Sequence, residues 1–220
     1  MLPQQLFGRV CIRHFVLTVP RQFGRPPAQK LSHKSTTTLA ETDSDSISGG
    51  GKLTQIIVER MTQMNRISEG DMAPDFTLPT DGGGSFSLSE NSGKGVVLFF
   101  YPKDDTSGCT KEAIGFSETR GEFEKLGFAV VGMSPDPVKK HDKFRDKHDL
   151  KITLISDEEK EVLGQYGVWV EKSMYGKKYM GVERTTLLIG ADRVVAKAWH
   201  KVKVPGHVDE VLAEARALSG

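Results

Sequence analysis

From residue 67 onward, short continuous apolar runs alternate with stretches in which apolar residues recur at helical spacing. Residues 70–90 hold short extended runs separated by proline and glycine. Residues 96–101 are apolar at every position, which predicts a strand buried on both faces of a sheet. Residues 110–126 carry apolar side chains three or four positions apart and predict a helix with one buried face. Residues 128–133 predict a second buried strand, so this part of the chain alternates strand, helix and strand.

Two helices around a strand are predicted next. Asp136-Pro137 favours a helix start with proline in the first turn, and the charged stretch up to His148 predicts a helix on the surface. Residues 152–155 predict a third strand. The acidic run that begins at Asp157 then opens a short helix, because acidic side chains stabilise a helix N-terminus.

The last part of the pattern predicts a hairpin and a closing helix. Residues 184–189 and 194–199 flank Gly190-Ala191-Asp192-Arg193, which is typical of a hairpin turn. Apolar residues return at helical spacing from Val208 to Leu218. Strands that alternate with helices and finish in a hairpin and a helix predict an α/β fold, a sandwich in which a central mixed β-sheet is flanked by helices.

The N-terminal part of the chain differs in composition from the rest. Residues 1–40 contain arginine, lysine, serine and threonine but no aspartate or glutamate, a composition typical of an organellar presequence. The alternative is that translation starts at Met61 or Met64 and that the preceding residues have no selected structure. Residues 41–52 are rich in serine and glycine and predict a flexible linker in either case. The sequence thus predicts a leader and linker, residues 1–66, and one folded domain, residues 67–220.

Charge and cysteine content limit the function classes. The 220 residues carry 30 Lys and Arg and 29 Asp and Glu, so the net charge of +1 gives no reason to expect nucleic acid or a membrane surface as partner. No apolar run approaches the roughly 18 residues that a membrane-spanning helix needs. Only two cysteines occur, Cys11 and Cys109. They are too few for a disulfide framework and indicate a reducing compartment with one thiol of interest.

One junction between a strand and a helix carries the candidate chemistry. The strand of residues 96–101 ends before Pro102, which stops the hydrogen-bond ladder, and after a polar loop Cys109 lies in the first turn of the next helix. Gly108 allows a ligand to approach the backbone closely. Because the unpaired N–H groups and the dipole at a helix start favour an anion, the thiolate of Cys109 should be stabilised there.

Neighbouring residues supply what attack on a peroxide bond by Cys109 requires, namely an aligned substrate and stabilised charge on the departing oxygen. Thr106 offers a hydroxyl that both donates and accepts, and the backbone N–H groups of Gly108 and Cys109 can donate to the oxygen under attack. Arg184, at the start of a predicted core strand, is the cation we nominate because its planar fork can contact sulfur and oxygen together. Sequence spacing alone does not show that Arg184 reaches Cys109.

Pro102, Thr106 and Cys109 have the spacing of a proline, a threonine four residues later and a cysteine three residues after that. Three longer strings occur in order: YPKDDTSGCTKEA, YGVWVEKSMYGKKYMGVERTTLLIG and KVKVPGHVDEVL. Together they resemble the bacterioferritin co-migratory protein (PrxQ) subfamily of the peroxiredoxins, over about residues 67–218. The resemblance implies a thioredoxin-like fold, antioxidant reduction of peroxides through a cysteine sulfenic acid, no metal or organic cofactor, and Arg184 as the active-site arginine. It also implies a monomer or at most a weak dimer.

The sequence departs from this subfamily at two positions. Many members carry proline where this chain has Ser107, and the usual resolving cysteine, five residues after the peroxidatic one, is replaced by Ile114. We therefore expect a one-cysteine cycle in which an external thiol, from thioredoxin or from glutaredoxin with glutathione, resolves the sulfenic acid on Cys109. Resolution by Cys11 is the alternative.

Other readings of the sequence remain. A peroxide sensor or relay would form the same sulfenic acid but pass it as a mixed disulfide to client proteins, whereas a non-catalytic binding module is disfavoured because the whole set of site residues is retained. His141 and His148 lie seven apart on one helix face, which we expect to be solvated rather than to bind a metal. We expect a bacterial cytoplasmic protein, or a mitochondrial matrix protein if residues 1–40 are a genuine presequence.

Overall fold

The computed structural model describes residues 66–219 except 92 and 175. The predicted leader and linker, apart from residue 66, and Cys11 lie outside the described residues. Within the described part, no helix is long and apolar enough to cross a membrane.

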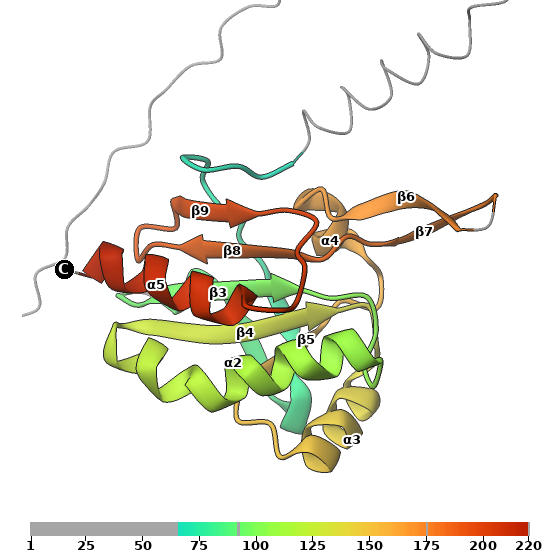
Figure 1. The fold of residues 1–220 in the computed structure, drawn as a ribbon, viewed down its shortest axis with the longest axis horizontal. Coiled ribbons are helices and arrows are strands. Elements are labelled where there is room, and N and C mark those ends of the chain that lie inside the picture. Colours follow the sequence, from blue (N-terminus) through green and yellow to red (C-terminus); the bar gives the residue numbers. More distant parts are fainter. Residues whose placement is uncertain (1–65, 92, 175, 220) are drawn as a thin grey trace, which may run out of the picture. The chain divides into compact units, whose positions relative to one another are not determined.

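A five-stranded sheet forms the centre of the domain, with the strand order β5-β4-β3-β8-β9 (Figure 1). Strand β3 (Gly95–Phe100) is central and pairs in parallel with β4 (Phe128–Ser134) and antiparallel with β8 (Thr185–Ile189). Strand β5 (Thr153–Ser156) lies parallel to β4, and β9 (Val195–Trp199) lies antiparallel to β8. The sheet is therefore mixed, as the sequence predicts.

Helices cover both faces of this sheet (Figure 1). Helix α2 (Ser107–Lys125), α3 (Val138–His148) and α5 (His207–Ser219) contribute apolar side chains to one core cluster. The short helix α4 (Glu161–Gln165) contributes to the cluster on the opposite face. Side chains of β3 alternate between the two clusters, as the pleat of a strand buried on both faces requires. The predicted α/β sandwich, and with it the thioredoxin-like arrangement of a mixed sheet between helices, is confirmed.

Two small hairpins accompany the central sheet. The first pairs β1 (Thr77–Pro79) with β2 (Ser85–Ser87) around the 3-10 turn η1 (Asp81–Gly83), in the region of predicted short extended runs. The second pairs β6 (Trp169–Met174) with β7 (Lys177–Val182) and projects away from the sheet (Figure 1). The apolar pattern did not predict the second hairpin, because most of its side chains are exposed and their polarity does not alternate.

Three predicted element starts differ from the structure. Helix α2 begins at Ser107, three residues earlier than its apolar pattern indicated. Pro137 precedes the first residue of α3 in an extended conformation (φ −71°, ψ 154°) and does not occupy the first turn. Asp157 does not open α4; its carboxylate instead accepts a hydrogen bond from the N–H of Leu163 at 2.8 Å, and the helix starts at Glu161.

Candidate active site

The candidate site lies where β3 gives way to α2. Tyr101 extends the strand by one bond, from its N–H to the Met133 carbonyl at 3.1 Å, and Pro102 then ends the ladder. A loop of residues 102–106, hereafter the site loop, leads into α2. Cys109 is the third residue of this helix, and only 1% of its surface is exposed. The strand, the loop and the helix therefore bring the thiol to the carboxyl end of the central strand.

Helix α2 directs unpaired donors toward this thiol. Its first backbone bond runs from the Thr110 N–H to the Thr106 carbonyl at 2.9 Å, so the N–H groups of Gly108 and Cys109 have no partner within the helix. These N–H groups and the positive end of the helix dipole favour a negative charge on the sulfur or on an oxygen bound beside it.

Thr106 contacts the sulfur directly. Its hydroxyl lies 2.9 Å from Cys109 Sγ and 3.1 Å from the Lys103 carbonyl oxygen. The hydroxyl carries one proton, which it can donate to the carbonyl or to a thiolate. Because Lys103 belongs to the same loop, the conformation of the loop determines where the Thr106 hydroxyl points.

Arg184 reaches the same sulfur from the neighbouring strand of the sheet, β8. It directly precedes β8, whose first residue Thr185 is paired with Phe100 at the end of β3. This register places Arg184 beside the start of α2, and one guanidinium nitrogen donates to Cys109 Sγ at 3.3 Å. Gly108 lies directly beside this arrangement, since a Cβ there would be in ordinary van der Waals contact with the same nitrogen, at 3.4 Å. The structure thus brings Thr106 and Arg184, both nominated from the sequence, into contact with Cys109.

Glu112 is a further member of the site that the sequence analysis missed. Its side chain is completely buried, one turn after Cys109, and forms an ion pair with the second terminal nitrogen of Arg184. The other carboxylate oxygen of Glu112 has no hydrogen-bond partner. Burial raises the pKa of Glu112 to about 7, although Arg184 opposes this shift. A carboxylate three residues after the cysteine, on the buried face of the helix, was the available signal.

Comparison with known proteins places this arrangement in a family. The sequence profile of the AhpC/TSA family matches residues 69–198. The chain belongs to the AhpC/TSA family. A Coxiella burnetii protein assigned to the bcp peroxiredoxins is 53% identical over 146 residues, which cover 66% of this chain and 97% of that protein. Peroxiredoxin Bcp of Escherichia coli is 41% identical over 149 residues, which cover 68% of this chain and 96% of the relative.

Solved structures of peroxiredoxins agree with this assignment. A structure of Xanthomonas campestris peroxiredoxin Q has a TM-score of 0.66 and 39% identity, covering 71% of this chain and 99% of the other. Another, of the bacterioferritin comigratory protein from the same organism, has a TM-score of 0.64 and 40% identity, covering 66% of this chain and 92% of that chain. The resemblance to the Bcp/PrxQ peroxiredoxins and the thioredoxin-like fold are confirmed, and the family supports thiol peroxidase chemistry.

This peroxiredoxin has a single thiol in its described domain. Cys109 is free, and no other cysteine occurs between residues 66 and 219. Ile114, at the position of the usual resolving cysteine, is half-buried and packs against the core cluster that includes Cys109. A disulfide within the domain is therefore excluded by composition.

A groove lies beside the start of α2 and opens to solvent. Its volume is about 620 Å³, and it runs between one side of α2 and the segment that leads into α5. The lining residues are Ser107, Gly108, Lys111, Gly115, Glu118, Thr119, Val204, Pro205, Gly206, Val208 and Asp209. The lining includes Ser107 and Gly108, the two residues before Cys109, but not Cys109, Thr106 or Arg184 themselves.

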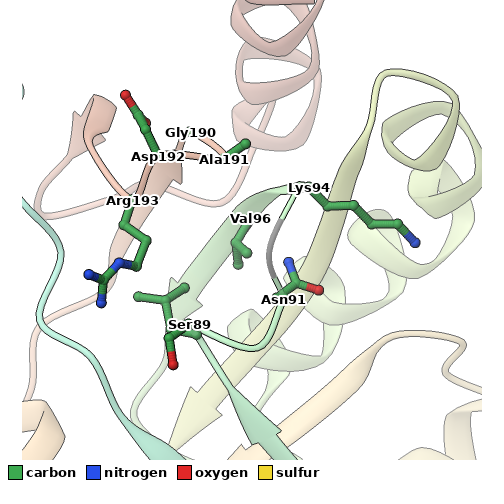
Figure 2. Close-up of a pocket in the computed structure, with 9 residues that line it drawn as sticks. Ser89, Asn91, Lys94, Val96, Gly190, Ala191, Asp192 and Arg193 are labelled. Carbon is green, nitrogen blue, oxygen red and sulfur yellow. The ribbon is translucent and has the colours of Figure 1, made fainter. Parts of the chain in front are cut away.

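A second, smaller pocket lies at the opposite end of β3 (Figure 2). It has a volume of about 250 Å³ and lies between the segment before β3 and the turn that joins β8 to β9. Its polar lining includes Lys94, Asp192 and Arg193. It contains no thiol and takes no part in the site around Cys109.

The expectation that His141 lies on a solvated helix face is wrong. Its side chain is completely buried, because His141 and Phe144 form the inward face of α3. His148 lies nearer the surface, with 21% of its side chain exposed, and contacts the Asp105 carboxylate at 2.8 Å. Within the described residues, no group of three or more His, Cys, Asp and Glu side chains is placed to bind a metal ion.

Proposed function

We propose that this peroxiredoxin reduces hydrogen peroxide and small organic hydroperoxides to water and alcohols through a sulfenic acid on Cys109, which an external thiol resolves. The observation that supports this proposal most directly is the pair of contacts on Cys109 Sγ, from the Thr106 hydroxyl at 2.9 Å and the Arg184 guanidinium at 3.3 Å. Both donors contact the sulfur at the N-terminus of a helix, and this position favours the thiolate form of Cys109.

The oxidation step follows from this geometry. The thiolate of Cys109 attacks one peroxide oxygen, an S–O bond forms as the O–O bond breaks, and the sulfur loses two electrons. The departing oxygen leaves as water or alcohol after taking up a proton. Arg184 and the backbone N–H groups of Gly108 and Cys109 stabilise the charge that develops on the peroxide oxygens, and Thr106 aligns the substrate. Pro102 fixes the point at which the site loop leaves the sheet.

An external thiol completes the cycle. The first thiol condenses with the sulfenic acid to a mixed disulfide and releases water, and a second thiol displaces Cys109 from that disulfide. Thioredoxin, or glutaredoxin with glutathione, is the reductant class we propose, because residues 66–219 contain no second cysteine. The relatives reported above are bacterial, which supports a cytoplasmic location in a bacterium.

Intact mass tests the proposal. The reduced protein is treated with one equivalent of hydrogen peroxide without reductant, and its mass is measured with and without a sulfenic-acid trapping reagent. We expect one added oxygen, trapped at Cys109 and absent from Cys109→Ser. Loss of two hydrogens would instead indicate a Cys11–Cys109 disulfide and contradict external resolution. An unchanged mass after prolonged exposure contradicts peroxidase activity.

Steady-state turnover then distinguishes an enzyme from a relay. Peroxide consumption is followed with thioredoxin and its reductase, and separately with glutaredoxin and glutathione. Fast recycling with either system supports the enzyme. Slow recycling with a persistent mixed disulfide supports the sensor instead.

A further inference from the structure

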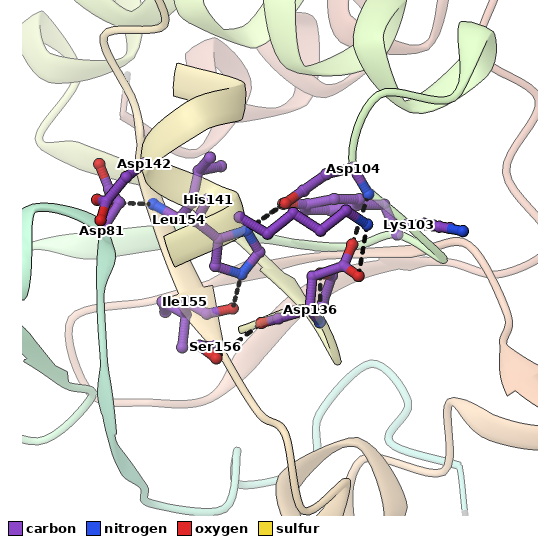
Figure 3. A network of polar contacts seen from close by, with 12 residues as sticks. Asp81, Lys103, Asp104, Asp136, His141, Asp142, Leu154, Ile155 and Ser156 are labelled. Carbon is purple, nitrogen blue, oxygen red and sulfur yellow. Dashed lines mark hydrogen bonds and ion pairs between the residues drawn. The ribbon is translucent and has the colours of Figure 1, made fainter. Parts of the chain in front are cut away.

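A buried polar cluster holds the site loop at Asp104 (Figure 3). The side chains of Asp104 and His141 are completely buried, and His141 Nδ1 lies 2.8 Å from Asp104 Oδ2. The Tyr101 hydroxyl, also buried, donates to Asp104 Oδ1 at 2.8 Å. None of these three side chains forms a hydrogen bond with Cys109 Sγ, whose side-chain donors are Thr106 and Arg184. The chemistry at the sulfur therefore does not account for them.

The hydrogen-bond partners of the imidazole determine where its protons lie. His141 Nε2 is 3.2 Å from the Ile155 carbonyl oxygen, which can only accept, so Nε2 carries a proton. On the other side Nδ1 faces Asp104 Oδ2, and this contact also needs one proton, on the nitrogen or on the oxygen. The Asp104–His141 contact therefore shares one proton between its two partners.

The backbone of Asp104 is anchored as firmly as its side chain. Its N–H donates to Asp136 Oδ2 at 2.6 Å. The other Asp136 carboxylate oxygen forms an ion pair with Lys140 at 2.7 Å, and the Asp136 carbonyl accepts a bond from the Ser156 hydroxyl at 2.7 Å. Figure 3 shows these residues converging on the loop from α3, from the segment before it and from the end of β5.

The carbonyl that orients Thr106 belongs to the residue just before Asp104. That carbonyl, of Lys103, shares a peptide group with the Asp104 N–H held by Asp136. A shift of Asp104 therefore shifts the Lys103 carbonyl, and with it the acceptor that holds the Thr106 hydroxyl beside Cys109. Arg184 and Glu112 lie on other elements and are not connected to Asp104 by any bond in this chain of contacts.

We propose that His141 is a positioning residue for peroxide reduction: through its shared proton it fixes Asp104, and thereby the Lys103 carbonyl and the Thr106 hydroxyl at the sulfur. This inference rests on the proposed function of Cys109. Without the imidazole, the buried Asp104 carboxylate loses its main partner and turns toward solvent, since an unpaired buried charge is unfavourable. The peroxide then loses alignment, while the thiolate keeps Arg184 and the helix N-terminus.

The proposal predicts different rates of Cys109 oxidation for three variants. Asp104→Asn removes the charge but can keep both side-chain hydrogen bonds. Its amide N–H can donate to Nδ1 of a neutral His141, while its carbonyl accepts from Tyr101. Asp104→Ala and His141→Ala break the pair. We expect the rate constant for Cys109 oxidation by hydrogen peroxide to fall about 10- to 100-fold in the two alanine variants, as for other small misplacements, and less than about 3-fold in Asp104→Asn.

A second readout separates positioning from general loss of structure. The rate of Cys109 alkylation by iodoacetamide reports the thiolate but needs no peroxide alignment, and we expect it to change less than about 3-fold in all three variants. Asp146→Asn is the matched control, because Asp146 lies on α3 outside the site loop and forms only a surface ion pair with Arg145. Its peroxide and alkylation rates should match those of the wild type.

Several results would overturn the proposal. These are wild-type peroxide rates in the alanine variants, a parallel fall of the peroxide and alkylation rates, or an equal loss in Asp104→Asn and Asp104→Ala. Should the alanine variants fail to fold, Tyr101→Phe carries the test: it removes one donor to Asp104 without a cavity and should slow oxidation about 3- to 10-fold. A wild-type rate in Tyr101→Phe overturns the proposal. Wild-type protein that forms no sulfenic acid refutes the proposed function itself.

Discussion

Arg184 donates to the sulfur of Cys109 across 3.3 Å, although 75 positions separate the two residues in the chain. The contact depends on the antiparallel pairing of β8 with β3, which aligns the start of one strand with the end of the other. Glu112 holds the second terminal nitrogen of the same guanidinium, so the fork is fixed at both ends. The positive charge at the sulfur is thus built into the sheet and α2, not into a mobile surface side chain.

Arg184→Lys keeps the positive charge but loses the planar fork. We expect the rate constant for Cys109 oxidation to fall about 10²- to 10³-fold, the usual cost of removing one well-placed donor from charge developing in a transition state. Stopped-flow measurement of peroxide consumption checks this value. Arg120→Lys is the control, because Arg120 forms only an exposed ion pair with Glu124. Equal rates in Arg184→Lys and Arg120→Lys would contradict the assigned role.

Thr106→Val replaces the hydroxyl that contacts Cys109 Sγ by a methyl group of similar size. We expect a fall of about 10- to 100-fold in the peroxide rate constant, because the substrate loses a donor and acceptor that aligns it. Thr106→Ser retains the hydroxyl and should stay within about 5-fold of the wild type. Competition kinetics for hydrogen peroxide compares the two variants, and identical rates for valine and serine would remove Thr106 from the mechanism.

Glu112 should make the stability of the domain depend on pH. Burial raises its pKa from 4.5 to about 7, so the folded state binds more protons than the unfolded state between these values. The contribution of Glu112 to the free energy of unfolding is fully present below pH 4.5 and is lost as the pH rises through about 7. It amounts to roughly 3 kcal/mol at most. Urea unfolding of the wild type and Glu112→Gln at several pH values measures it.

The difference in the free energy of unfolding between the wild type and Glu112→Gln separates the contribution of Glu112 from those of other titrating groups. Burial lowers the pKa of His207 to about 4, so that residue contributes with the opposite sign in an overlapping range. We expect the free energy of unfolding of the wild type, relative to Glu112→Gln, to decline from pH 5 to pH 8. A difference that is constant over this range would show that Glu112 is ionised throughout.

Gly132 of β4 has no room for a side chain. A Cβ there would lie 2.5 Å from Cζ of Phe99, which is fully buried and stacks on Phe116 of α2 with a ring-centroid distance of 4.7 Å. Gly132→Ala should lower the free energy of unfolding by about 1–3 kcal/mol, because the packed ring cannot move aside.

Gly121→Ala is the matched control for this substitution. A Cβ on Gly121 in α2 meets nothing within 4 Å, so alanine there should be neutral or stabilise the helix by up to about 1 kcal/mol. Denaturant unfolding of both variants gives the comparison, and equal stabilities would contradict the packing argument.

Local sequence was sufficient for the part of the site that depends on chain neighbours. Pro102, Thr106 and Cys109 lie within eight consecutive residues, so a strand, a loop and a helix start determine their arrangement. The approach of Arg184 could be nominated but not shown, because it needs the register between two strands far apart in the chain.

Buried polar residues were harder to predict than apolar ones. His141 lies among lysines and aspartates. Because of these charged neighbours, the sequence pattern did not reveal the inward helix face that His141 shares with Phe144. Glu112 was passed over because a glutamate in a charged helix is ordinarily solvated. In both cases the compensating partner, Asp104 or Arg184, comes from a distant segment, and no periodicity within the helix encodes it.

The deep placement of Cys109, with 1% of its surface exposed, has opposite consequences for the two halves of the proposed cycle. A small peroxide can enter beside a helix start that stays in place, and a rigid loop keeps its oxygens aligned. A protein thiol is bulkier than a peroxide, so we expect its approach to require a displacement of the first turn of α2. We therefore expect the rigidity that favours oxidation to slow reduction in that cycle.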